Sequence, residues 1–168
     1  QYKIDALESQ RKTVEDALLE FNRSLVNAES LESNARALLA KMEKLELDPE
    51  QAGALPSDIP RADEIRTALE QWRTATVDRD GLLATFTPKH PEVQAQDNLV
   101  ALYRDQALQA LERAKATALA NHKLLEDQAD MLRKKKDEQN RLAADLEIQI
   151  VERRTRLATM ERARDAAD

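Results

Sequence analysis

The centre of the chain reads Leu83-Ala84-Thr85-Phe86-Thr87-Pro88-Lys89-His90-Pro91-Glu92-Val93-Gln94. Proline fixes φ, has no N–H to donate, and pushes the residue before it out of the α region. Two prolines this close together therefore end any helix that reaches them. The sequence on both sides is charged and rich in Leu and Ala, which is typical of long helices. The chain is therefore expected to reverse its direction here.

The residues of this segment also indicate how the next helix begins. Pro91 is expected at the first helical position, where its missing N–H costs nothing. His90, held extended by that proline, takes the cap position, and Glu92 lies in the first turn, where the helix dipole favours an anion. Thr87 is a second candidate for a cap. The turn is predicted over residues 85–90.

Composition points to coiled coil. The 168 residues are 42% apolar but only 3% aromatic and 35% charged, with two glycines and no cysteine. Such a chain buries a narrow seam and leaves little room for a catalytic pocket. The net charge of −6 comes from 26 basic and 32 acidic residues that are interspersed, whereas nucleic-acid binders gather basic charge on one face. The one strong basic run, at 133–136, is followed at once by two acidic residues, which favours local ion pairing.

The first arm, about residues 2–47, has a regular heptad seam. Its positions alternate spacings of three and four: Ile4, Leu7, Arg11, Val14, Leu18, Phe21, Leu25, Ala28, Glu32, Ala35, Leu39 and Met42. All but Arg11 and Glu32 are apolar, which predicts a coiled-coil helix.

A connector over residues 48–60 interrupts this pattern. Its prolines and glycine forbid a continuous helix. Asp48 is expected to cap one brief turn that begins at Pro49. A shorter helix is predicted over about 61–84, with Ser57, Asp58 or Asp63 as its cap. The seam of this helix is expected to contain Ile65, Leu69, Trp72, Thr76, Leu83 and Phe86. Trp72 is expected to pack at a helix–helix contact with its edge exposed.

The final arm, about residues 91–168, is the longest helix. Its expected seam comprises Leu99, Leu102, Leu111, Ala118, Leu125, Ala129, Leu132, Leu142, Leu146, Ile150, Leu157 and Met160, with Lys136, Gln139 and Arg153 at positions where the register asks for apolar residues. This arm would span on the order of 110 Å, nearly the combined length of the first arm and the shorter helix. We therefore predict one all-α module, an elongated antiparallel coiled-coil hairpin with one arm broken by the proline-rich joint. A three-helix rod, with the shorter helix folded back beside the first, is the alternative.

The central segment resembles a motif of bacterial polysaccharide co-polymerases, the chain-length determinant and exopolysaccharide-transport proteins of the Wzz, Wzc and GumC type. In that family an aromatic residue, a proline, a His-Pro pair and a valine precede a long helix. The matching residues here are Phe86, Pro88, His90, Pro91 and Val93, with Lys89 inside the motif. The resemblance covers about residues 55–111, because the proline-rich stretch before the shorter helix also looks like the family's.

The resemblance implies a periplasmic structural and oligomerisation module of an inner-membrane protein that controls the chain length or export of a surface polysaccharide. It implies a homo-oligomer formed through coiled-coil contacts, and a polysaccharide polymerase or export machinery as partner. The motif residues named above would form the turn and a candidate interaction site. A periplasmic adaptor hairpin of an efflux or secretion system, or a cytoplasmic coiled-coil scaffold, are the alternative functions.

An enzyme is not expected. The two histidines, His90 and His122, lie far apart, with no cysteine to complete a metal site, and no phosphate-binding glycine loop is present. We expect no catalytic residue, no metal, no cofactor and no nucleic-acid partner, and His122 is expected to face solvent. The sequence begins and ends within helical pattern, so we expect a fragment of a larger membrane protein whose membrane segments, and any kinase domain, lie outside it.

Overall fold

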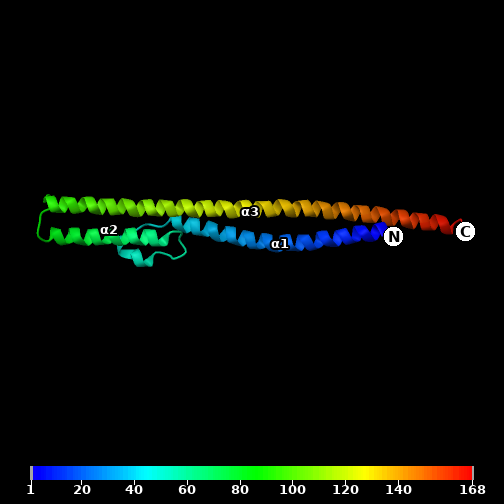
Figure 1. The fold of residues 1–168 in the computed structure, drawn as a ribbon, viewed down its shortest axis with the longest axis horizontal. Helices are drawn as coiled ribbons and strands as arrows, with labels where there is room; N and C mark the ends of the chain where they lie inside the picture. Colours follow the sequence, from blue (N-terminus) through cyan, green and yellow to red (C-terminus); the bar gives the residue numbers. More distant parts are fainter. Residues whose placement is uncertain (1, 168) are drawn as a thin grey trace. The chain divides into compact units, whose positions relative to one another are not determined.

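A computed structural model describes residues 2–167 and shows an all-α protein (Figure 1). It contains the α-helices α1 (Tyr2–Glu43), α2 (Ala62–Leu83) and α3 (Pro91–Asp165), and a short 3-10 helix, η1 (Pro49–Ala54). No residue between 2 and 167 lies in a strand. The chain forms two compact units. We call residues 1–32 with 125–168 the terminal unit, and residues 33–124 the central unit.

The terminal unit pairs the first part of α1 with the last part of α3. Ion pairs join the two helices, among them Glu8–Arg154, Arg11–Glu147 and Glu29–Arg133. As the residue number rises along α1, the partner's number falls along α3, so the two helices are antiparallel. The predicted all-α hairpin of antiparallel helices is confirmed.

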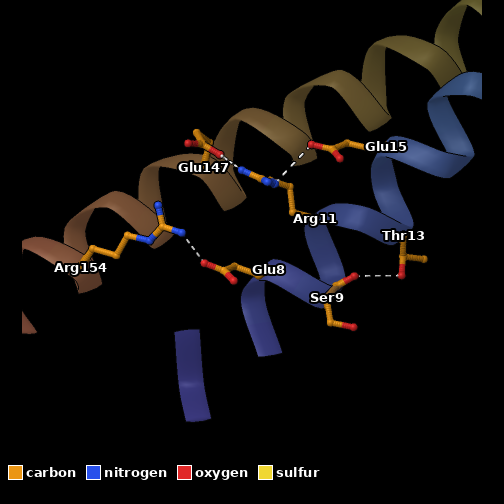
Figure 2. Close-up of polar contacts among 7 residues, drawn as sticks. All are labelled: Glu8, Ser9, Arg11, Thr13, Glu15, Glu147 and Arg154. Carbon is orange, nitrogen blue, oxygen red and sulfur yellow. Dashed lines mark hydrogen bonds and ion pairs between the residues drawn. The ribbon is translucent and has the colours of Figure 1, made fainter. Parts of the chain in front are cut away.

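The seam of α1 is where the heptad pattern places it. Every seam residue predicted in the first arm is buried or half-buried. The two polar exceptions lie in the seam as well: Glu32 is buried, and Arg11 is half-buried. In Figure 2 the guanidinium of Arg11 lies between Glu15 of its own helix and Glu147 of α3. Its Nη1 donates to Glu147 over 2.9 Å, whereas its Nε lies 3.3 Å from Glu15 without hydrogen-bond geometry.

In the central unit, the end of α1 and the whole of α2 lie one after the other along α3 (Figure 1). Met42 near the end of α1 and Ile65 near the start of α2 are both fully buried in one apolar cluster with α3. Arg113 of α3 bonds Glu64 of α2, and further along Gln96 of α3 bonds the carbonyl of Ala75. This pairing is again antiparallel, and α2 does not fold back beside α1 as the three-helix alternative required.

The connector between α1 and α2 is part of the core. Ala52, Leu55 and Ile59 are buried in the same cluster as Met42 and Ile65. Lys41, in the last turn of α1, lies 3.3 Å from Asp58, which closes the connector into a loop, and Glu50 of η1 lies 3.7 Å from Arg73 of α2. Asp48 caps η1 by accepting from the amide of Glu50 over 2.9 Å, with Pro49 at the first position, as predicted.

The helix before the connector ends earlier than predicted. We expected it to reach about residue 47, but α1 ends at Glu43. Leu45 and Leu47 are half-buried and pack against the cluster, whereas Glu46 between them is exposed to solvent. This period of two is that of extended chain, so the backbone leaves the helix to bring both leucines inward.

The start of α2 also differs from prediction. Its cap is Arg61, in the left-handed region with φ 57°, rather than Ser57, Asp58 or Asp63. The carbonyl of Arg61 accepts from the amides of Glu64 and Ile65, and its side chain lies 2.7 Å from Glu64. At the far end of the chain, α3 ends at Asp165, and residue 168, to which we had extended the helix, lies outside the described residues.

The seam of α3 in the central unit is built mostly on alanine; Leu111 and Ala118 are buried as predicted, whereas Ala107, Ala110 and Ala114 were not predicted. The buried residues there are Val93, Ala107, Ala110, Leu111, Ala114 and Ala118. The predicted seam residues Leu99, Leu102, Leu142 and Met160 are exposed, as is Leu83 of α2. The larger side chains of α1, the connector and α2 fill this part of the cluster, so α3 contributes small ones. Among residues 2–167 no helix is long and apolar enough to cross a membrane.

Candidate functional site

The turn between α2 and α3 is the candidate site, and its first part closes the end of α2. The amides of Ala84 and Thr85 donate to the carbonyls of Gly81 and Leu82, at 3.3 and 3.0 Å, and the amide of Phe86 donates to Leu82 at 2.8 Å. These bonds satisfy carbonyls that the end of a helix leaves without intrahelical partners. Phe86 is thereby held within one turn of the helix end.

A tight turn follows over residues 87–90. The amide of His90 donates to the carbonyl of Thr87 over 2.9 Å, so Pro88 and Lys89 occupy the two central positions. Proline suits the first of these because its fixed φ matches the turn. Thr87 therefore contributes its carbonyl to the turn and does not cap α3, contrary to the second possibility raised above.

His90 occupies the position immediately before α3, as predicted. Its Nδ1 accepts from the amide of Glu92 over 3.3 Å, and its carbonyl accepts from the amide of Gln94 over 3.0 Å. Pro91 is the first residue of the helix. An imidazole nitrogen accepts a hydrogen bond only when it carries no proton.

The imidazole of His90 also stacks on the ring of Phe86. The ring centroids are 4.0 Å apart and the planes are inclined by 19°. Both side chains are half-buried. The stack joins Phe86, shortly after the end of α2, to His90, immediately before α3, so it fixes the two ends of the turn against each other.

The six predicted motif residues thus have three different environments. Val93 is buried at 1% exposed and belongs to the core. Phe86 and His90 form the half-buried stack. Pro88, Lys89 and Pro91 are exposed, and of these only Lys89 carries a charge. A partner that meets this turn would therefore contact a proline-lysine tip supported by an aromatic pair.

A second feature, a groove between α2 and α3, escaped the sequence analysis. It has a volume of about 560 Å³, and its lining includes the uncharged residues Thr74, Ala75, Gln96, Leu99 and Tyr103 and the charged residues Arg66, Glu70 and Asp78. Gln96 spans its floor, with Nε2 donating to the carbonyl of Ala75 over 3.1 Å. Charged residues border it as they do on an ordinary coiled-coil flank, so the sequence pattern carries no signal for it.

Within residues 2–167, ion pairs shift the pKa values of Glu64, Arg11 and Arg133. Arg113 donates from Nε to Glu64 over 2.9 Å, and this hydrogen bond lowers the pKa of Glu64, with Arg61 acting in the same direction. In the terminal unit the hydrogen bond to Glu147 raises the pKa of Arg11. The hydrogen bond to Glu29, followed by that to Asp130, raises the pKa of Arg133.

The remaining residues singled out in the sequence have structural surroundings. In the basic run, Arg133 is paired with Glu29 and Asp130, which fits the expected local ion pairing. Lys136 and Gln139 are half-buried at the seam, and Trp72 is half-buried against the central cluster, as expected.

His122 was expected to face solvent, but its side chain is half-buried because it lies on the seam side of α3. Within residues 2–167 no group of three His, Cys, Asp or Glu residues is placed to hold a metal ion.

Comparison with known proteins gives one partial similarity. No protein-family model matches the chain, and no solved structure matches it. The chain is 42% identical over 62 residues to ATP synthase subunit b 1 of Ruegeria sp. (strain TM1040). The match spans 36% of this chain and 34% of that protein, about a third of each. Charged helical sequences share a restricted alphabet and a heptad period, so a match of this length indicates similar helix more than a shared role.

Proposed function

We propose that this chain is a periplasmic structural and oligomerisation module of an inner-membrane protein that controls the chain length or export of a surface polysaccharide. The observation that carries the proposal is the construction of the turn. Of the residues behind the family resemblance, Phe86, Pro88 and His90 build the turn, Pro91 starts α3, and Val93 is buried in the core. These contacts support a structural role for the motif in this chain.

The rest of the chain supports a structural role. Its helices bury narrow seams, and the Glu64–Arg113 and Glu29–Arg133 pairs join them along their surfaces. A perturbed carboxylate in a cleft would favour an enzyme, but Glu64, whose pKa is lowered, is held by an arginine in an ordinary interhelical ion pair. We therefore propose no catalytic residue, and we propose polysaccharide polymerase or export machinery as the partner of the full-length protein.

The role of the turn is tested in the full-length protein in its native host. Phe86→Ala and His90→Ala each remove the stack, and Thr85→Ala serves as the matched control because its side chain is exposed beside the same turn and is not part of the motif. We expect the first two variants to change the length distribution of the surface polysaccharide and the oligomer size in detergent, and the control to change either less. Wild-type values for both turn variants, with the protein present in the membrane at normal level, would contradict the proposal.

The proposed location has a separate test. The chain contains no cysteine, so Lys89→Cys in a full-length protein freed of other cysteines offers a single thiol on the exposed turn. A maleimide that does not cross the inner membrane should label it in cells whose outer membrane has been permeabilised. Labelling only after the inner membrane is broken would instead support the cytoplasmic scaffold.

A further inference from the structure

The terminal unit carries a groove between the first turn of α1 and the last part of α3. It has a volume of about 480 Å³, and its apolar lining comes from Ile4 of α1 and from Leu157 and Met160 of α3. Ile4 is buried and Leu157 is half-buried, whereas Met160 is 70% exposed. A large apolar side chain that is so open to water gains free energy when another apolar group covers it. The groove therefore offers an apolar wall to a ligand.

Basic side chains gather at the same groove. Lys3 of α1 and Arg153 and Arg156 of α3 line it, together with one carboxylate, that of Glu152. The groove thus has an excess of positive charge, although the chain as a whole carries a net charge of −6. A charge of this sign in an acidic chain indicates a contact with an anion.

The two arginines are not held by carboxylates of the chain. Arg154, which lies between them in the sequence, is paired with Glu8 of α1 (Figure 2). Arg153 and Arg156 form no such pair within residues 2–167. They are three positions apart and therefore lie on one side of α3, with Met160 four positions after Arg156. A guanidinium group without a carboxylate partner can bind a phosphate through two parallel hydrogen bonds.

We propose that this groove binds an acidic phospholipid of a bilayer, with the phosphate on Arg153 and Arg156 and the first carbons of the acyl chains against Met160. Protein surfaces that lie on membranes combine basic and apolar side chains in the same way. An anionic amphiphile is the class of ligand that occupies the charged and the apolar parts of the groove together. The proposal goes beyond the proposed function, which assigns no ligand to the terminal unit, and does not depend on it.

Other anions match only one part of the groove. A free phosphate would pair with the arginines but leave Leu157 and Met160 in water. A nucleic acid needs a longer array of cations to neutralise its successive phosphates, and a long polyanion would also run on past the groove along an acidic chain. A bilayer differs from both because it presents acidic head groups beside apolar surface.

The number of charges sets the strength of this contact. Each basic residue near an acidic membrane strengthens binding about fivefold, and Glu152 offsets one of the three cations. At physiological salt, charges more than about 8 Å apart are screened from each other. The groove can therefore meet an acidic surface although the chain carries a net charge of −6. We expect weak binding that is largely lost when the salt concentration is raised to about 1 M.

Vesicles of two compositions test the charged part of the groove with the 168-residue chain. In flotation experiments, vesicles of phosphatidylglycerol and phosphatidylcholine in equal parts should bind the chain at least about tenfold more tightly than phosphatidylcholine alone. The double variant Arg153→Gln, Arg156→Gln should lose about tenfold or more of this binding. The control, Arg141→Gln with Arg162→Gln, removes the same charge from exposed positions of α3 outside the groove and should lose less than about threefold.

The apolar part of the groove has a separate readout. The chain contains no cysteine, so Met160→Cys and the control Met131→Cys, which replaces another exposed methionine of α3, can each carry one polarity-sensitive dye. On acidic vesicles the emission of the dye at position 160 should shift to shorter wavelength, and that of the dye at position 131 should not. Sodium phosphate should displace the chain from the vesicles no better than sodium chloride of equal ionic strength.

The proposal is overturned by equal binding to the two kinds of vesicle, by equal losses in the two double variants, or by equal shifts of the two dyes. Preferential displacement by phosphate would overturn it in favour of a site for the free anion. Tighter binding to poly-glutamate than to the acidic vesicles would overturn it in favour of an acidic protein. Circular dichroism checks that each variant keeps its helix content.

Discussion

The rings of Phe86 and His90 stack at a centroid distance of 4.0 Å across the turn that joins α2 to α3. His90 contributes to this turn twice, once through the stack and once through Nδ1, which caps α3. The two contributions can be separated by mutation, because asparagine can cap a helix but cannot stack as an aromatic ring does.

We predict an energetic coupling between these two residues. Phe86→Leu keeps an apolar side chain but removes the stack, and should cost about 0.5–1.5 kcal/mol of unfolding free energy. His90→Asn should cost a similar amount, and the double variant hardly more than either single one. Urea unfolding of the four proteins measures the coupling. Strictly additive losses would show that the stacked geometry contributes nothing to stability.

A second prediction concerns the alanines of α3. Ala114 is fully buried against the central cluster, whereas Ala116, on the same helix, is exposed. Ala114→Leu should lower the free energy of unfolding by about 1–3 kcal/mol, because a close-packed site has no room for the added atoms. Ala116→Leu should change it by less than about 0.5 kcal/mol, since leucine is nearly as good a helix former. Equal effects of the two substitutions would mean that this part of the seam is loosely packed.

These alanines also mark the limit of what could be predicted from the sequence. In α1 the large apolar residues, such as Val14 and Leu25, are themselves the seam, so the heptad pattern is visible. In α3 the leucines at 99 and 102 face outward, and between residues 107 and 118 mostly alanines face inward, where the connector and two helix ends supply the bulk. The phase of α3 thus depends on a packing partner that lies far away in the sequence.

More of the turn than of the α3 seam could be predicted from the sequence. Proline and cap chemistry act locally, so Pro91 at the first position of α3 and Asp48 as the cap of η1 follow from the residues alone. The stack of Phe86 on His90 does not, because it depends on how the whole turn closes. The left-handed backbone conformation of Arg61 before α2 could not be predicted either, since arginine has no preference for that conformation.

A third prediction uses pH. The hydrogen bond from Arg113 lowers the pKa of Glu64 in the folded chain. The stabilisation from this carboxylate is therefore complete above its unfolded pKa of about 4.3 and is lost as the pH falls through the lower folded value. Glu64→Gln should melt at a lower temperature than wild type at neutral pH, and the gap should narrow between about pH 5 and pH 3.

The control for this pH experiment is on the same helix. Glu70 lies 3.9 Å from Arg73, a looser contact, so Glu70→Gln removes a carboxylate without removing a tight pair. Its melting temperature should differ less from that of the wild type at either pH. A gap for Glu64→Gln that is as wide at pH 3 as at pH 7 would show that the effect of the glutamine is steric rather than electrostatic.

The last prediction concerns Arg11, which occupies a seam position that the heptad pattern assigns to an apolar residue. Its pair with Glu147 is partly exposed, and such pairs contribute about 0–1 kcal/mol. A half-buried leucine at this position would contribute about 1–1.5 kcal/mol, roughly half the value of full burial. Arg11→Leu should therefore raise the unfolding free energy by up to about 1 kcal/mol, and leave Glu147 solvated.

The control is Arg154→Leu, which removes the neighbouring pair with Glu8 from the more exposed surface. It should change the unfolding free energy by less than about 0.5 kcal/mol. A polar residue in a seam fixes register at a cost in stability. If Arg11→Leu is instead less stable than the wild type, the arginine contributes to the stability of the helix pair and is not only a register marker.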